Sequence, residues 1–240
     1  MFFDASLSGA LDRIAERAAD VRRAYTPGAV PRYDDVATPA PVSDFTLDPL
    51  SVAAPDGAYF IAGDGEHGRC YTRNGAFALR EGTLVDGDGR AILGARGSAG
   101  ELTALRIDPV DDALGRVRDV AIAPDGTLSY RRETIDPRTG ERTQQGVEVG
   151  RIALARLPAG TRPETGDGSD VSAPPGVTPQ TGFAQDGSFP ALVPMRRERS
   201  RIDIDESLIR LKDAYLTFDA LQAAQAAKGR LSKTAMDLLK

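Results

Sequence analysis

The chain has 240 residues and a net charge of −5, with one His, one Cys and no Trp, but 25 Gly and 16 Pro. A Cys/His metal site needs three or four ligands, so His67 and Cys70 cannot form one by themselves, and an intrachain disulfide needs a second Cys. The acidic balance disfavours general nucleic-acid binding, and no apolar run approaches the roughly 20 residues of a membrane span. A basic, apolar leader is also absent from the first residues, so we expect either a cytoplasmic location or export without a cleaved signal peptide.

Proline usage divides the chain into five segments. Pro is concentrated in residues 36–57 and 158–200. Because Pro lacks an N–H and fixes φ, these two segments are predicted to be extended linkers rather than central strands or helices. The predicted order is an N-terminal helix within residues 1–35, a linker over 36–57, a β domain over 58–157, a linker over 158–200 and a C-terminal helix within 201–240.

The N-terminal segment carries apolar residues at alternating steps of four and three, which is a coiled-coil heptad pattern. The stripe consists of Leu7, Leu11, Ile14, Ala18 and Val21. The opposite face is charged and includes Asp20 and Arg23. Thr26-Pro27-Gly28 is predicted to end the helix, because a residue before proline avoids the α region.

The C-terminal helix is predicted to begin near Asp203, with Glu206 three residues later as in a capping box. Its apolar stripe consists of Leu208, Leu211, Tyr215, Phe218, Leu221, Leu231 and Leu238, with a phase shift after Phe218. Neither helix can bury its stripe alone in water, so each needs the other helix or a neighbouring subunit. An ordinary two-helix hairpin docked on the β domain is the simpler alternative.

The central segment alternates short β-branched or aromatic runs with turn dipeptides that favour tight hairpins. These dipeptides are Asp64-Gly65, Asn74-Gly75, Asp86-Gly87, Asp88-Gly89 and Asp125-Gly126. No crossover helix fits between the runs, so a parallel doubly wound sheet is disfavoured. The predicted fold is a mainly β, antiparallel and hairpin-rich central domain, inserted between N- and C-terminal helices that pair as a coiled coil.

Residues capable of chemistry do not form a specific site. Asp86-Gly87-Asp88-Gly89 resembles the start of a calcium loop, but the late Glu and following helix are absent, so a hairpin turn is predicted. His67 and Cys70 lack an orienting third group and are interpreted as exposed loop residues. The basic cluster Arg196-Arg197-Glu198-Arg199 is interpreted as a solvated linker with ion pairs. We therefore expect no enzyme activity, catalytic residue, metal or cofactor.

Tyr71–Leu79, followed by Gly82–Val85 and later by Val149–Leu157, resembles in order the signature of bacterial flagellar rod and hook proteins. Tyr71–Leu79 and Gly82–Val85 are similar to the family's YTRxGxFxL strand and GxLVxxxGxxxLG hairpin, and Val149–Leu157 is similar to its VGQIxLxxF strand. The signature residues here are Tyr71, Thr72, Arg73, Asn74, Gly75, Phe77, Leu84, Val85 and Gly89. The family's Asn-rich N-terminal motif is missing, although its Thr-Pro-Gly remains, so the chain looks like a divergent member, closest to the proximal or distal rod proteins.

The resemblance implies a structural subunit of the basal-body rod. Such subunits are exported through the flagellar type III apparatus without a cleaved signal and polymerise into a helical tube that serves motility. The expected partners are other copies and neighbouring rod or hook subunits, with the two helical stripes as the assembly interface. The alternatives are a secreted β-domain binding protein oligomerised by a terminal coiled coil, and an enzyme that uses His67 as a general base.

Overall fold

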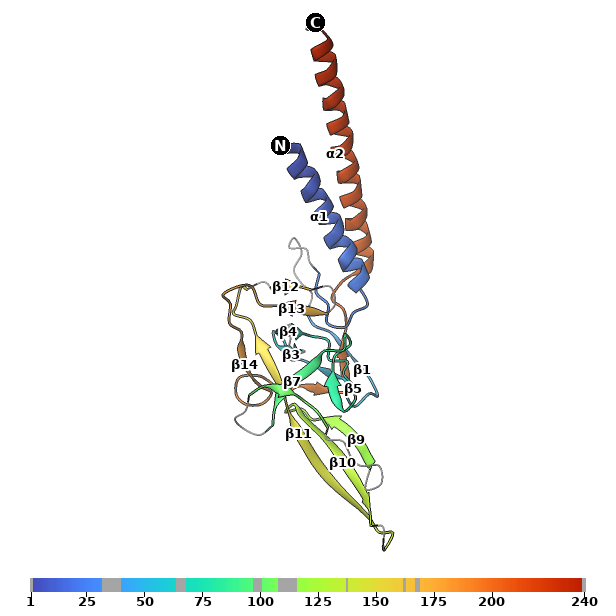
Figure 1. The fold of residues 1–240 in the computed structure, drawn as a ribbon, viewed down its shortest axis with the longest axis vertical. Coiled ribbons are helices and arrows are strands. Elements are labelled where there is room, and N and C mark those ends of the chain that lie inside the picture. Colours follow the sequence, from blue (N-terminus) through green and yellow to red (C-terminus); the bar gives the residue numbers. More distant parts are fainter. Residues whose placement is uncertain are drawn as a thin grey trace. The chain divides into compact units, whose positions relative to one another are not determined.

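The structure is a computed structural model, and it describes residues 2–31, 40–63, 68–96, 101–107, 116–136, 138–161, 163–166 and 169–238. It is mainly β, with a helix at each end of the described chain: α1 (Phe2–Arg23) and α2 (Ile204–Leu238) (Figure 1). The chain forms two compact units. The helical unit comprises Met1–Tyr25, Val30–Thr38 and Ile202–Lys240, and the β unit comprises Thr26–Ala29 and Pro39–Arg201.

The β unit contains the strands β1 (Ser43–Phe45), β2 (Val52–Ala53), β3 (Tyr59–Gly63), β4 (Arg69–Thr72), β5 (Ala78–Arg80), β6 (Thr83–Val85), β7 (Ala91–Ala95), β8 (Thr103–Ala104), β9 (Arg116–Ile122), β10 (Thr127–Ile135), β11 (Arg142–Arg156), β12 (Glu164–Thr165), β13 (Asp170–Ser172), β14 (Gln180–Phe183), β15 (Val193–Pro194) and β16 (Arg196–Glu198). Twelve of them form one sheet, whose main path is β12-β13-β4-β3-β11-β7-β6-β5. The strand β11 is the centre of this sheet, because it pairs with β3, β7, β10 and β14.

A three-stranded ribbon of β9, β10 and β11 extends from the rest of the β unit (Figure 1). Where the ribbon joins the body, β10 alternates between the core and solvent, so that Leu128 and Tyr130 are buried. The body itself is built around fully buried side chains such as Phe60, Ile152 and Leu154. Phe60 packs edge-on against Phe77, with ring centroids 4.9 Å apart.

The C-terminal helix begins as predicted. The Asp203 carboxylate accepts hydrogen bonds from the backbone N–H groups of Asp205 and Glu206, at 2.9 and 3.1 Å, and therefore caps the first turn of α2. The Glu206 side chain also pairs with Arg210, one turn further along the helix, at 2.8 Å. Asp205 and Glu206 also place negative charge at the positive end of the helix dipole.

The structure has a mainly β unit between two terminal helices, and consecutive strands such as β3–β4, β5–β6 and β10–β11 pair antiparallel. The fold-class prediction is nevertheless wrong in two respects. First, the predicted linkers over residues 36–57 and 158–200 contribute strands: β1 pairs with β16, β2 with β15 and β13 with β4. Proline is tolerated there because these are short strands, and Pro194 itself lies in one of them. Many neighbours in the β unit are thus distant in sequence rather than hairpin-linked.

The second error concerns the helices. The two helices pack against each other, but the predicted heptad stripe is not buried as a coiled-coil seam. The fully buried positions of α1 are instead small or charged, namely Ala10, Ala19, Asp20 and Arg23. Asp20 and Arg23 were expected on the solvated face, yet they form a buried ion pair at 3.8 Å.

Candidate assembly surface

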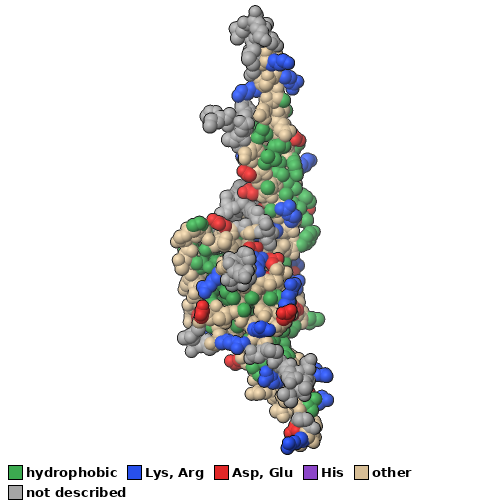
Figure 2. Space-filling model, viewed as in Figure 1, with side chains coloured by type: hydrophobic (Ala, Val, Ile, Leu, Met, Phe, Trp, Pro, Cys, Tyr) green, Lys and Arg blue, Asp and Glu red, His purple; other side chains and the backbone are tan. Residues whose placement is uncertain are grey.

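The first candidate surface lies on the two helices, where large apolar side chains remain in contact with solvent. On α1, Leu11 is 52% exposed, while Leu7, Ile14, Ala18 and Val21 are half-buried. Figure 2 shows hydrophobic side chains along the surface of the helical part of the chain. One chain therefore leaves part of the predicted α1 stripe uncovered.

The longer helix α2 is more exposed than α1. Leu211, Phe218 and Leu221 are half-buried, whereas Leu208 and Tyr215 are half-exposed. The side chain of Leu238 lies outside the described residues. The predicted α2 stripe is therefore partly covered along one side and open to solvent along the other.

Two exposed apolar residues of α2 lie outside the predicted stripe. Ile209 and Leu216 are 62% and 56% exposed, and seven residues separate them, so they share one side of the helix. Leu231, further along the helix, is 72% exposed. We call Leu208, Ile209, Tyr215, Leu216 and Leu231 the α2 apolar surface. A search for one heptad stripe could not find Ile209 and Leu216, because they follow a second, parallel stripe.

The signature residues of the β unit are, by contrast, inside it. Tyr71, Thr72, Arg73, Asn74, Phe77, Leu84 and Val85 are all buried, and Gly89 takes a positive φ of 85° in a turn. These side chains therefore belong to the interior of the β unit rather than to a surface site.

Arg73 is the centre of a buried polar network. Its Nη2 lies 2.7 Å from Glu198 Oε2, with the two side chains 3% and 1% exposed, and its Nη1 donates to the carbonyl of Ala58 at 2.6 Å. Arg201 also pairs with Glu198, at 2.9 Å. Glu198 thus joins β16 to the end of β4, so the predicted solvated linker is wrong at this residue. A buried charge without such partners is strongly unfavourable. Arg196, Arg197 and Arg199 are exposed, and Arg199 forms an ion pair with Asp44.

The residues around Asn74-Gly75 do not form the predicted hairpin turn. Asn74 is buried, and its side-chain oxygen accepts a hydrogen bond from Ala76 N at 3.1 Å. Gly75 accepts a hydrogen bond from Val52 N at 2.9 Å, and a Cβ on Gly75 would lie 1.7 Å from the carbonyl oxygen of Val52. This glycine is therefore required by close backbone approach.

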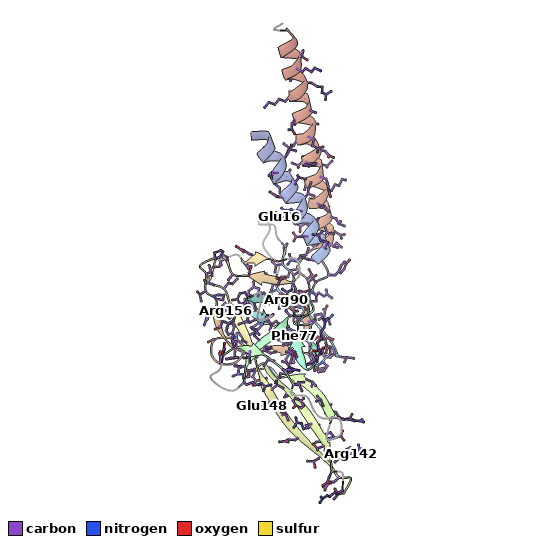
Figure 3. All side chains as sticks on the ribbon, in the orientation of Figure 1. Glu16, Phe77, Arg90, Arg142, Glu148 and Arg156 are labelled. Atoms are coloured by element: carbon purple, nitrogen blue, oxygen red, sulfur yellow. The ribbon has the colours of Figure 1, made fainter. Side chains whose placement is uncertain are left out.

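The Asp86–Gly89 segment is a hairpin turn, as predicted. Asp86 Oδ1 accepts from the backbone N–H groups of Asp88 and Arg90, at 3.0 and 2.8 Å. Arg90, labelled in Figure 3, pairs with Asp86, Asp88 and Asp170. Burial raises the pKa of Asp86. Among the described residues, no three His, Cys, Asp or Glu side chains are placed to hold a metal ion.

Of the two residues considered for nucleophilic chemistry, only Cys70 lies within the described residues. His67 lies outside the described residues. Cys70 is partly buried beside Arg90, and burial raises the pKa of its thiol. A raised pKa reduces the fraction of reactive thiolate at neutral pH, so Cys70 has the properties of a structural cysteine.

Neither α1 nor α2, over its described residues, combines the length and apolar character needed to cross a membrane.

Comparison with known proteins adds no family assignment. The sequence matches no protein-family model, and no curated protein matches it significantly.

Proposed function

We propose that this chain is a structural subunit of the bacterial flagellar basal-body rod, which self-assembles through its terminal helices and has no enzymatic role. The observation that carries the proposal is the α2 apolar surface, together with exposed Leu11 on α1. Several large apolar side chains exposed along one helix are more than the singly scattered ones that are normal on a protein surface, and such groups usually mark interaction sites. The motif resemblance suggests which assembly the chain belongs to, and the exposed helix residues suggest how its subunits make contact.

The distribution of the exposed residues favours an open assembly over a closed dimer. At 100° per residue, Leu208 and Tyr215 lie on one side of α2, and Ile209 and Leu216 lie about a quarter turn away. Charged Asp205, Lys212 and Asp219 are exposed between the two rows. Two separate rows on one helix allow contacts with two different neighbours, as the head-to-tail interfaces of a helical tube require.

The proposed location is the periplasm-spanning rod, after export by the flagellar type III apparatus without a cleaved signal. The proposed partners are further copies of this chain and the adjoining rod or hook subunits. Side chains buried in the β unit hold that unit together, while the helices make the contacts between subunits.

Electron microscopy of the purified protein tests this proposal. We expect tubes or stacked rings from the natural chain, and only dispersed particles from Leu216→Asp, because a charge in the apolar row must be desolvated on assembly. The matched control is Thr217→Asp, which adds the same charge at the next exposed position, outside both rows. Discrete dimers or trimers from the natural chain would favour the oligomeric binding protein instead. Normal assembly of Leu216→Asp would show that this surface is not the interface.

A further inference from the structure

A cavity of about 440 Å³ opens where the ribbon leaves the body of the β unit. Its described lining includes three arginines, Arg96, Arg106 and Arg151, and an apolar group formed by Tyr130, Val147 and Val149. Glu148, labelled in Figure 3, belongs to the same lining. The volume is within the range of small-ligand pockets, which combine an apolar lining with a few placed polar groups.

An irregularity in β11 shapes this cavity. The register of β10 and β11 shifts between Leu128, which pairs with Gly150, and Ser129, which pairs with Glu148. The extra residue is Val149, so the strand bends there as at a β-bulge. Gly150 then passes so close to β7 that a Cβ would lie 2.7 Å from the carbonyl oxygen of Ala95. Arg151 pairs with Ala95 in the sheet and is therefore brought beside Arg96.

The guanidinium of Arg151 is held in place by neutral groups. Its Nε and Nη2 donate to the carbonyl of Asp125 at 3.2 and 3.1 Å, and Nη2 also donates to the carbonyl of Ala184. The guanidinium carbon lies 5.4 Å from the centre of the Phe183 ring. These partners fix the guanidinium and use its Nε and Nη2 donors, so among the described residues Nη1 is the group left to donate to a bound carboxylate or phosphate. The charge of Arg151 also acts on the nearby carboxylates of Asp125 and Asp186 and lowers their pKa.

The other arginines add charge to the same cavity. Arg96 Nη2 donates to the carbonyl of Arg106 at 2.7 Å, which places the two residues together. Within the described residues, no carboxylate lies within 4.0 Å of the guanidinium of Arg106 or Arg151. The Asp125 carboxylate accepts from Thr127 N at 3.0 Å and Thr127 Oγ1 at 2.8 Å, and these bonds hold it in its ionised form at the edge of the cavity. The three arginines outnumber the two carboxylates of the described lining, Asp125 and Glu148, and this excess of positive charge favours an anion.

We propose that this cavity binds a small organic anion, with a carboxylate or phosphate against Arg96, Arg106 and Arg151 and an apolar body on Tyr130, Val147 and Val149. Glu148 at the same cavity repels an extended polyanion, so the site selects a ligand with one compact charged end. The inference rests on the β unit alone and is independent of the role proposed for the helices.

Titration of the full chain with phenyl phosphate, followed by isothermal calorimetry and by amide NMR shifts, tests the proposal. We expect saturable binding that moves the amide signals of Tyr130 and Gly150 and weakens as salt is added. Arg106→Gln should weaken binding about tenfold, because a charge-assisted contact is lost. Arg106 makes no side-chain hydrogen bond or ion pair among the described residues, so this variant should melt like the natural chain.

The matched control is Arg138→Gln, an exposed arginine in the β10–β11 turn, which should bind like the natural chain. Inorganic phosphate should bind more weakly than phenyl phosphate, because it cannot use the apolar side of the cavity. No saturable binding up to about 10 mM phenyl phosphate would overturn the proposal. Equal effects of Arg106→Gln and Arg138→Gln would also overturn it. Equal affinities for phenyl phosphate and inorganic phosphate would show that Tyr130, Val147 and Val149 do not contribute to binding.

Discussion

The two units of this chain differ in the side chains that dominate them, which are a buried charged network in the β unit and exposed apolar rows on α2. In the β unit, even charged side chains such as Arg73 and Glu198 are buried and satisfied by partners. In the helical unit, even large apolar side chains such as Leu216 and Leu231 are exposed. The β unit also leaves Phe45 and Leu47 64% and 82% exposed, so the contrast lies between its buried charged network and the rows of exposed apolar side chains along α2.

The largest expected effect concerns close packing in the β unit. Gly75→Ala should destabilise it by at least about 3 kcal/mol, because the added Cβ would lie 1.7 Å from the Val52 carbonyl oxygen and must displace backbone. Urea denaturation measures the change in the free energy of unfolding. The control Gly146→Ala meets nothing within 4 Å and should change it by less than about 0.5 kcal/mol. Equal effects would show that the β unit is less tightly packed than described.

Removal of Glu198 tests the buried charged network in the interior of the β unit. Glu198→Ala leaves the buried Arg73 without its carboxylate and should cost about 3–5 kcal/mol. Asp44→Ala, which breaks the exposed Asp44–Arg199 pair, should leave the denaturation midpoint unchanged. If Glu198→Ala were as stable as the natural chain, the network would not hold β16 in place.

A leucine in each unit allows a direct comparison between them. Leu154 is fully buried, so Leu154→Ala should cost about 2–5 kcal/mol. Leu216 is 56% exposed, so Leu216→Ala should change the free energy of unfolding of the monomer by less than about 0.5 kcal/mol. Measurements at concentrations below assembly make the comparison valid. A large loss at Leu216 in the monomer would mean that α2 is already covered within one chain.

The smallest effect depends on pH. Burial opposes ionisation of Asp125, but hydrogen bonds from Thr127 and the charge of Arg151 outweigh it and lower the pKa of this carboxyl. The stability that the carboxylate contributes is therefore present above its unfolded pKa of about 3.9 and is lost as the pH falls through its lower folded pKa. Asp125→Asn should make the acid side of the stability curve shallower, as thermal melts between neutral and acidic pH can measure. An unchanged curve would contradict this assignment.

Two local sequence signals predicted local structure correctly, whereas the Asn74-Gly75 turn signal did not. The Asp203 cap and the Asp86 turn each depend on hydrogen bonds within a few residues, and both occur as expected. The burial of Glu198 could not be predicted, because its partner Arg73 is 125 residues away and the surrounding sequence is highly charged. The Pro-rich strands were missed for the same reason, since only their distant partner strands show that these segments can pair at the edges of the β unit.

The candidate site was predictable only in part. The 4–3 spacing identified Leu208, Leu211 and Tyr215 as apolar positions of one helix, but spacing alone cannot tell which of them the partner helix covers. The exposure of Ile209 and Leu216 and the burial of Asp20 depend on how the two helices are rotated against each other. That rotation is decided by packing along their whole length rather than by the heptad pattern of either one.

The pairing of β1 with β16 has a consequence for how such a protein can change over time. Ser43 lies opposite Glu198, and Arg201 N donates to the Ala29 carbonyl at 2.9 Å, so the beginning and the end of the β unit are held together. A domain whose two ends lie close together tolerates insertions and deletions in its distant loops, because these do not alter the spacing of the flanking segments. Insertions into the ribbon, at the β10–β11 turn, should therefore leave the helical unit undisturbed, and the same helical frame can carry β units of different sizes.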